Sequence, residues 1–369
     1  MKIAIDVRSL MEGRVTGVEV YTTEIIRALL TVGSEHEYHL FYNSYRSVTL
    51  PEFRGNVTVH PSSYPNKLFN VAQLVTRRPR WDKLLPVTPD CVFVPNVRLM
   101  PLSFDVPVVV TAHDLSFERF PEFFSWRRRL WHRTMLPQQL MFNADHVFAD
   151  SAATAHDVTE LYNVPTADVS VVYPGVGQVQ ADVSVSEVRR SHNLPEKYVL
   201  YLGSFEPRKN IPSIIAAFST IAGEVEHDLV LAGSRGWLME PIKRALAESP
   251  VRDRIHYLGF VPEAEKHALY ASADLFVYPS FYEGFGFPPL ESLLAGTPVI
   301  TSMNSALPEV VGEWATLINP YDPSELAAVM RELLHDVPPV TADTQGRIAN
   351  RFSWEAAANQ ILKKIAEVV

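Results

Sequence analysis

Glu283 and Glu291 are two carboxylates that stand eight residues apart in the stretch FYEGFGFPPLE, residues 281–291. The apolar run before this stretch predicts a buried strand over 273–280, and LESLLAG after it predicts helical turns that end at Gly296. Prolines suit the first helical position, so we expect Glu291 in the first turn of the helix and Glu283 on the loop before it.

A strand, a glycine-containing loop and a helix N-terminus together form an anion site, because backbone N–H groups and the helix dipole both favour negative charge. The two carboxylates can accept hydrogen bonds from sugar hydroxyls. A phosphate beside sugar hydroxyls describes a nucleotide sugar. In the alternative interpretation, Glu291 only complements the helix dipole and Glu283 is a solvated loop residue.

Arg208 and Lys209 form a second group that could bind a diphosphate. They follow a predicted strand over 198–203, in the loop SFEPRKN, and precede a helix that we expect from about residue 212. Cations at the carboxyl end of a strand can bind phosphate through charge-assisted hydrogen bonds. The alternative is an exposed charge pair.

The elements that must position these residues follow a strand–loop–helix pattern that occurs at residues 3–30 and again at 198–220. The pattern predicts two Rossmann-like domains. Ser151 or Asp150 and Asp322 are expected helix caps. The remaining predicted strands are 37–42, 57–59, 92–96, 108–114, 144–151, 169–176, 228–234, 255–261 and 298–301, and the remaining predicted helices are 125–143, 305–311 and 354–369.

Three motifs carry a resemblance to a known family: Glu-x7-Glu with Gly-Phe-Gly between, AGTPVI at 295–300 and EPRKN at 206–210. The chain resembles the retaining glycosyltransferases of family four. The resemblance covers most of the chain, and the whole pattern resembles bacterial mannosyltransferases of surface-polysaccharide assembly. It implies an α/β GT-B fold, in which two Rossmann-like domains face a cleft. We expect an acceptor domain over 1–175, a linker over about 176–195, a donor domain to residue 353 and a terminal helix, 354–369, that crosses back to the first domain.

The resemblance also implies roles for single residues. His113, at the end of the strand over 108–114, would contact the transferred sugar. Glu283 and the amides of 284–287 would bind the hydroxyls of that sugar, and Glu291 would bind the ribose. Catalysis would need the two domains to close. The catalytic candidates are His113, Glu283 and Lys209. The donor-binding candidates are Gly17, Ser204, Arg208, Lys209, Phe260, Val261, Glu283, Gly284, Phe285, Gly286, Phe287, Leu290 and Glu291.

Four of these candidates, Gly17, Ser204, Phe260 and Val261, depart from the family pattern or leave alternatives open. Gly17 stands where the family often has a glycine pair, and it can equally be a turn glycine. Ser204 stands where some relatives have an arginine, so Arg208 would compensate. The base would meet Phe260 or Val261, and the sequence leaves open whether the Phe260 ring stacks on it or lies in the core.

The implied reaction moves a hexose from a nucleoside diphosphate sugar to a hydroxyl of a glycan or lipid-linked glycan, with retention. GDP-mannose is the first expected donor, followed by UDP-linked sugars. We expect no metal and no other cofactor, because there is no suitable Asp-x-Asp motif and two cations can supply the charge. The alternatives are a nucleotide-sugar epimerase, a non-catalytic sugar-nucleotide-binding module and a phosphorylase, which would need pyridoxal phosphate and a longer chain.

The composition limits the class of protein and its partners. The 369 residues are 47% hydrophobic and 20% charged, which predicts a globular chain of two domains. The net charge of −9 divides into −1 over residues 1–174 and −8 over the rest, which argues against nucleic acid as a partner. The single Cys91 excludes an internal disulfide, and with no signal segment or membrane-length apolar run we expect a cytoplasmic protein.

Two arginine clusters with tryptophans lie in the first half of the chain. One holds Arg77, Arg78, Arg80 and Trp81, and the other is Trp126, Arg127, Arg128, Arg129, Leu130, Trp131 and Arg133. Arginine beside tryptophan suits the interface of an anionic bilayer, so the hypothesis is docking at the inner membrane face. The alternative is that the arginines are solvated and the tryptophans belong to the core.

Overall fold

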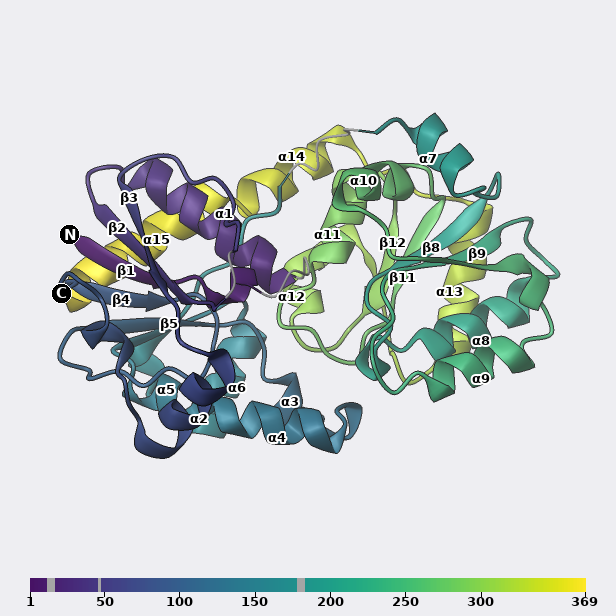
Figure 1. Ribbon diagram of the computed structural model, residues 1–369. Helices are drawn as coiled ribbons and strands as arrows, with labels where there is room; N and C mark the ends of the chain where they lie inside the picture. Colours follow the sequence, from purple (N-terminus) through teal and green to yellow (C-terminus); the bar gives the residue numbers. More distant parts are fainter. Residues whose placement is uncertain (12–16, 46–47, 178–182) are drawn as a thin grey trace. The chain divides into compact units, whose positions relative to one another are not determined.

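The computed structural model describes residues 1–11, 17–45, 48–177 and 183–369 (Figure 1). The chain divides into two compact units. Unit 1 is Met1–Arg119, Trp126–Gly175 and Phe352–Val369, and unit 2 is Phe120–Ser125 and Val176–Arg351. The short segment Phe120–Ser125 therefore packs with unit 2 although both its neighbours in sequence belong to unit 1.

In the described part of unit 1, seven strands form a parallel sheet in the order β3-β2-β1-β4-β5-β6-β7. Their bounds are β1 Lys2–Asp6, β2 Glu37–Asn43, β3 Val57–Ser62, β4 Cys91–Val94, β5 Val108–Ala112, β6 His146–Ala149 and β7 Val169–Val171. Every residue of β4, β5 and β6 is buried, as expected for parallel strands covered on both faces.

The core of unit 1 has two layers, because side chains alternate across a strand. Ile3 and Ile5 pack into one apolar cluster, and Ala4 between them packs into the other. Helices α1 and α15 cover the first cluster, and α2, α5 and α6 cover the second (Figure 1). The helices of this unit are α1 Gly17–Val32, α2 Asn66–Thr76, α3 Ser116–Arg119, α4 Trp126–Met135, α5 Pro137–Asn143, α6 Ala152–Tyr162 and α15 Trp354–Val368.

In the described part of unit 2, six strands form a parallel sheet in the order β10-β9-β8-β11-β12-β13. Their bounds are β8 Tyr198–Leu202, β9 Asp228–Ala232, β10 Ile255–Gly259, β11 Leu275–Tyr278, β12 Val299–Ser302 and β13 Thr316–Ile318. The helices are α7 Val185–Ser191, α8 Ile211–Ile221, α9 Glu240–Glu248, α10 Glu263–Ala271, α11 Phe287–Leu294, α12 Leu307–Val311, α13 Pro323–His335 and α14 Ala342–Arg351.

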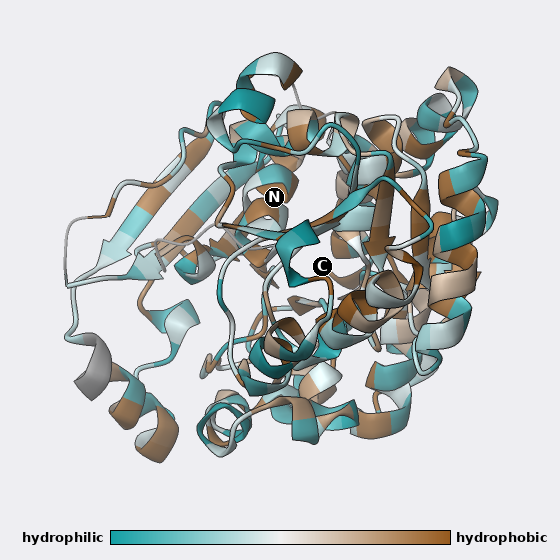
Figure 2. Cartoon of the chain, turned by 90° about the vertical axis from the view of Figure 1, so that its right-hand side faces the viewer, coloured by the Kyte–Doolittle hydropathy of each residue, from teal (hydrophilic) through white to brown (hydrophobic). Residues whose placement is uncertain are grey.

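The helices of unit 2 form two groups. Helices α8, α9 and α13 lie together, and α7, α10, α11 and α14 form the other group (Figure 1). In Figure 2 hydrophilic and hydrophobic residues mix along the outer helices, as expected for helices with one face on a core and one in water.

Each sheet has one point where the strand order reverses. In unit 1 it lies between β1 and β4, and in unit 2 between β8 and β11. Loops that leave the carboxyl ends of two such strands diverge to opposite faces of the sheet, and ligands of open α/β sheets bind in the crevice between them. The loops after β8 and β11 carry Arg208, Lys209 and Glu283.

Several expected elements differ from the structure. The helix expected over 125–143 is two helices, because the chain turns at Leu136 (φ 53°) immediately before Pro137. The strand expected over 169–176 ends at Val171. The segment expected as a linker contains α7, which is held to unit 2 by the buried Val188 and by Arg189, whose guanidinium donates to the carbonyl oxygen of Ser272 at 3.1 Å; residues 178–182 of that linker lie outside the described residues.

Candidate functional site

Glu283, Arg208 and Lys209 meet at the crevice where the strand order of unit 2 reverses. Arg208 and Lys209 lie in a 3-10 turn, Pro207–Lys209, between β8 and α8, and Glu283 lies in the loop between β11 and α11. The two loops are joined through the backbone, since the amide of Phe281 donates to the carbonyl oxygen of Arg208 at 2.8 Å. The fold therefore brings together residues that stand about 75 positions apart in sequence.

The carboxylate of Glu283 is bound by both cations. Oε1 accepts from Nζ of Lys209 at 2.5 Å, and Oε2 accepts from Nη1 of Arg208 at 2.7 Å. Nζ of Lys209 also donates to the hydroxyl of Tyr278, and Nε of Arg208 donates to Glu206 at 3.1 Å. Two cations and two carboxylates thus form one nearly neutral cluster in this structure.

The cluster shifts the pKa of its members in the directions expected for a buried ion pair. Burial raises the pKa of the Glu283 carboxyl, but Arg208 and Lys209 outweigh burial and lower that pKa to about 2. Burial and the neighbouring Arg208 lower the pKa of Lys209, while Glu283 opposes them. Glu283 is therefore held ionised, and Lys209 is the cation whose charge is least firmly fixed.

Gly286 shapes the loop that leads into α11. Its φ is +103°, and a Cβ atom there would lie 2.6 Å from Cδ2 of Leu307. The left-handed conformation and the lack of space both require glycine. The backbone N–H of Glu283 donates to Oγ of Ser305 at 2.8 Å, which holds the loop at Glu283.

The structure corrects the expected position of Glu291. Helix α11 begins at Phe287, one residue before the two prolines, so its first turn holds no acidic residue and Glu291 is the fifth helical residue. The positive φ of Gly286 permits this early start. Glu291 therefore does not cap the helix N-terminus, which removes the alternative in which it only complements the helix dipole.

Glu291 faces α10. Its Oε2 accepts a hydrogen bond from the hydroxyl of Tyr270 at 2.9 Å. Burial raises the pKa of the Glu291 carboxyl, whereas the nearby Lys266 acts to lower it. Glu291 as a whole residue is half-buried.

The other donor-binding candidates fall into buried and accessible groups. The Phe260 side chain is 66% exposed and Val261 is 3% exposed, so the Phe260 ring is not in the core. Leu290 is fully buried and Phe285 nearly so, which gives both of them a packing role. Gly284 is buried, Phe287 is half-buried, and Oγ of Ser204 donates to Glu206 at 2.7 Å.

In unit 1, Gly17 and His113 occupy separate elements. Gly17 is the first residue of α1, and a Cβ atom there would meet no neighbour within 4 Å. His113 follows β5 directly, and its Nδ1 lies 2.7 Å from Oδ2 of Asp150, which follows β6. The ring of Tyr21 packs edge-on against His113 at 4.6 Å between centroids.

Asp150 determines the orientation of His113. A carboxylate at Nδ1 accepts the Nδ1 proton, which directs the other ring nitrogen, Nε2, away from Asp150. That Nε2 atom is buried. Burial lowers the pKa of His113, but Asp150, together with Asp114 and a backbone hydrogen bond with Pro95, outweighs burial and raises it overall.

Two family models match the chain and together cover most of it. The model described as Glycosyl transferases group 1 matches residues 184–362, and the model described as Glycosyltransferase Family 4 matches residues 15–177. The chain is a GT-B glycosyltransferase. The first matched segment contains the strands β8 to β13 of unit 2, and the second contains β2 to β7 of unit 1.

Relatives of this glycosyltransferase include O-antigen enzymes. It is 28% identical over 365 residues to the O-antigen chain mannosyltransferase B of Escherichia coli, an alignment that covers 94% of this chain and 95% of that one. It is 33% identical over 202 residues to the serotype-specific mannosyltransferase WbdA of Escherichia coli, covering 52% of this chain and 25% of WbdA. The second match therefore spans about a quarter of that relative.

Solved structures share the fold of this glycosyltransferase. Sucrose-phosphate synthase from Thermosynechococcus elongatus superposes with a TM-score of 0.78 at 21% identity, covering 99% of this chain and 98% of that one. Anabaena HepE in complex with UDP and glucose superposes with a TM-score of 0.72 at 19% identity, covering both chains completely. At these identities the superpositions show the fold.

Several residues of the site in this glycosyltransferase were not predicted from the sequence. Tyr278 contacts Lys209, and Ser305 contacts Glu283. No local sequence pattern marks Tyr278 or Ser305 as part of the site. Lys266 and Tyr270 stand four positions apart, a spacing that places both on one helical face and could have indicated a joint role.

The arginine–tryptophan clusters of the glycosyltransferase differ in exposure. Trp81 is 1% exposed and packs against Phe41, Phe69 and Arg8, so its expected place at a membrane surface is wrong. Trp126 and Trp131 are 63% and 49% exposed. No helix in the described ranges is both long and apolar enough to span a bilayer, and within those ranges no three His, Cys, Asp or Glu side chains gather as metal ligands.

Proposed function

We propose that this glycosyltransferase transfers a hexose from a nucleoside diphosphate sugar to a hydroxyl of a surface glycan or lipid-linked glycan, with GDP-mannose as the first donor to test. One observation carries the donor site: Glu283, Arg208 and Lys209 form a buried cluster at the switch point of the unit 2 sheet. The names of the mannosyltransferase relatives support mannose and surface polysaccharide.

The cluster offers a way to bind a diphosphate. Arg208 and Lys209 share one carboxylate, so a diphosphate that approaches them can take one or both cations as hydrogen-bond donors. The oxygens of Glu283 that are released would then accept from sugar hydroxyls. As the sugar leaves, the same cations would stabilise the charge that develops on the leaving diphosphate.

Glu291 would bind the ribose of the donor. Its Oε2 is already held by Tyr270, which fixes the orientation of the carboxylate and leaves Oε1 for the ligand. Phe260, with its exposed ring, is the candidate to meet the base.

The proposed reaction retains the anomeric configuration and uses no metal and no further cofactor. Two cations at the cluster supply the charge that a divalent ion supplies elsewhere. The departing phosphate itself would assist the acceptor hydroxyl on the same face of the sugar. We further propose that Nε2 of His113, a buried atom whose orientation Asp150 fixes, contacts the transferred sugar.

The experiment compares GDP-mannose alone with GDP-mannose plus a lipid-linked glycan and measures free GDP and the configuration of the product. Acceptor-dependent release of GDP with an α-linked product supports the proposal. An epimerase would change the nucleotide sugar with no acceptor, and a binding module would release no GDP. Either result would contradict the proposal, and a panel of UDP-sugars then tests the next donor class.

We also propose that α4 docks on an anionic membrane. Residues 126–131, sequence WRRRLW, are all exposed, so two tryptophans, one leucine and three arginines face solvent on one short helix. Aromatic rings settle at headgroup depth, and each cation near an anionic surface contributes about 1 kcal/mol. The arginine cluster with its exposed tryptophans would hold the enzyme at the surface that carries a lipid-linked acceptor.

Co-sedimentation with vesicles that contain anionic lipid tests this docking. Binding should fall as salt is raised and should drop when Arg127, Arg128 and Arg129 become serine. A matched control replaces Lys243, Arg244 and Arg252, three exposed cations of unit 2, by serine and so changes the net charge equally. An equal loss in both triple variants would contradict a specific role of α4.

A further inference from the structure

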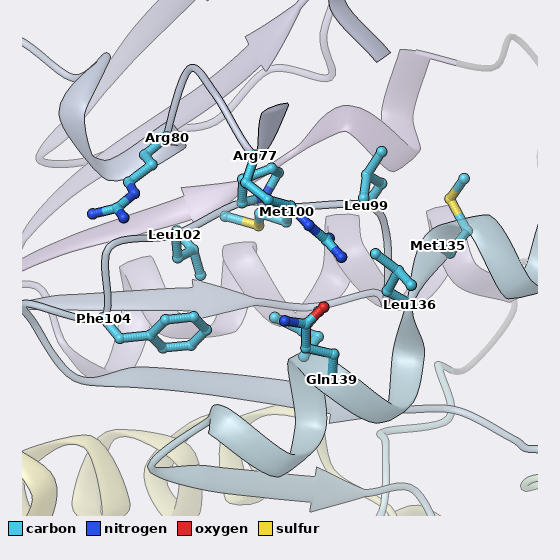
Figure 3. Close-up of a pocket in the computed structure, with 11 residues that line it drawn as sticks. Arg77, Arg80, Leu99, Met100, Leu102, Phe104, Met135, Leu136 and Gln139 are labelled. Carbon is cyan, nitrogen blue, oxygen red and sulfur yellow. The ribbon is translucent and has the colours of Figure 1, made fainter. Parts of the chain in front are cut away.

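Unit 1 contains a pocket that none of the donor-binding or catalytic candidates lines. Its volume is about 210 Å³, and it lies between the end of α2, the loop that follows β4 and the junction of α4 with α5 (Figure 3). The residues that line it are Arg77, Arg80, Leu99, Met100, Pro101, Leu102, Phe104, Met135, Leu136, Gln139 and Leu140.

The charged groups of this pocket have one sign. Arg77 and Arg80 line it and no acidic residue does. Neither arginine forms an ion pair with any residue in the described ranges. In Figure 3 the guanidinium of Arg77 points into the pocket toward the amide of Gln139, while Arg80 lies at its edge. The polar end of the pocket is therefore suited to an anion.

The remaining wall is apolar. Met100, Leu102 and Leu140 are nearly buried and belong to the second core cluster of unit 1, and the Phe104 ring is 41% exposed. An apolar cavity of about 150 Å³ holds a benzene-sized molecule, so about 210 Å³ holds a short length of hydrocarbon but not a whole acyl chain. The rest of such a chain would stay outside the pocket.

Backbone strain is concentrated at the same place. Arg77, Phe104 and Leu136 have φ values of 56°, 57° and 53°, a region that bulky L-residues rarely occupy. Leu136 also precedes a proline, which disfavours helical conformations further. Among described residues other than glycine, asparagine and serine, only Leu238 shares this conformation outside the pocket. Arg77 adopts this conformation as the C-cap of α2, where a left-handed residue is common.

We propose that this pocket binds the phosphate-bearing end of a single-chain lipid, with the phosphate at Arg77 and Gln139 and the first carbons of the chain against Met100, Leu102 and Leu140. The inference rests on the proposed function, since such a lipid would be the carrier of a lipid-linked acceptor. A free phosphate would use the arginine but leave the apolar wall in water, and a neutral lipid would leave the arginine without a counter-charge.

Binding of decyl phosphate below its micelle concentration tests the proposal, with decanol and inorganic phosphate as the two partial ligands. We expect saturable binding of decyl phosphate, at least tenfold weaker binding of decanol and of inorganic phosphate, and about tenfold weaker binding in Arg77→Gln, which corresponds to about 1.4 kcal/mol. Arg80→Gln, at the edge, should have a smaller effect. Equal affinity for decyl phosphate and for either partial ligand would overturn the assignment.

The matched control is Arg78→Gln, because Arg78 is an exposed arginine beside Arg77 that does not line the pocket. Affinity for decyl phosphate should be unchanged in this variant. An equal loss of decyl phosphate affinity in Arg77→Gln and Arg78→Gln would overturn the assignment of this pocket and indicate binding by diffuse surface charge. Binding of GDP is measured on the same parent and variant proteins. Loss of GDP binding in Arg77→Gln would count against the donor site of unit 2. If GDP binding is retained while decyl phosphate binding is lost, the effect belongs to the lipid pocket alone.

Discussion

At the scale of single residues, Glu283 is the centre of the proposed donor site. Its two oxygens are bound by two different cations, so the carboxylate orients the groups that would hold a diphosphate. A buried carboxylate with a single partner is easily left with an uncompensated charge. With two partners, one cation can move to a ligand while the other still neutralises Glu283.

Replacing Lys209 by alanine should lower turnover by about 100- to 1,000-fold, the range typical of losing one preorganised charge-stabilising group. Folding should survive, because Arg208 still pairs with Glu283. Steady-state kinetics and thermal unfolding on the same samples check both statements. Lys197→Ala removes an exposed lysine paired with Glu226 and should leave turnover unchanged; turnover within a few-fold of the parent in Lys209→Ala would place the diphosphate elsewhere.

The low pKa of Glu283 predicts a pH dependence of stability. The pKa of its carboxyl falls from 4.5 to about 2 on folding, so the stabilisation is complete above pH 4.5 and is lost as the pH falls toward 2. Between pH 4.5 and pH 3 the free energy of unfolding should fall by roughly 2 kcal/mol from this group. The free energy of unfolding of Glu283→Gln, measured by urea titration at each pH, should not show that part of the decrease. An equal dependence of this free energy on pH in variant and parent would contradict the assignment.

At the scale of elements, the loop before α11 depends on one backbone conformation. Gly286→Ala should destabilise the protein by about 1–2 kcal/mol, because φ is +103° and Leu307 occupies the space for a Cβ atom. Donor affinity should fall as well, since the loop positions Glu283 and α11. Gly223→Ala is the matched control, with open space and no positive φ. Denaturant titration measures the stability, and nucleotide binding measures the donor affinity. If Gly286→Ala and Gly223→Ala have equal stability and equal affinity, Gly286 does not shape the loop.

Local sequence patterns predicted most elements, because the strands are short apolar runs and the caps are short-range features. Ser151 and Asp322 cap α6 and α13 as expected, each through a side-chain oxygen that accepts from the backbone of the next turn. The early start of α11 and the break at Leu136 were not predicted, since both depend on residues in the left-handed region. The burial of Trp81 against Arg8 is a contact between distant segments that no local pattern contains.

At the scale of the whole molecule, both sheets place their candidate residues at the carboxyl ends of strands. The ends of apolar runs placed His113, Arg208, Lys209 and Glu283 after predicted strands, and the family resemblance gave them their expected roles. The partners that fix them, such as Asp150 for His113, were not predicted, because strand order is a property of the fold and not of the local sequence.

The proposed reaction also predicts that activity is independent of divalent metal. Turnover of the whole enzyme with donor and acceptor should be unchanged in excess EDTA, because Arg208 and Lys209 supply the positive charge at the diphosphate. Adding Mg²⁺ or Mn²⁺ after EDTA treatment is the control. A loss of activity in EDTA that either ion restores would contradict a metal-free reaction.

The most direct test of the donor site is calorimetric titration of GDP and UDP into the parent protein, Glu291→Ala and Glu313→Ala. Glu313 is an exposed carboxylate of unit 2 outside the proposed site and controls for the change of charge. We expect at least one nucleoside diphosphate to bind the parent and the control equally and to bind Glu291→Ala more weakly by roughly 1.5–3 kcal/mol, because the ribose loses a charged acceptor. Equal affinity in all three proteins, or no binding of either nucleotide to the parent, would contradict a donor site at Glu291.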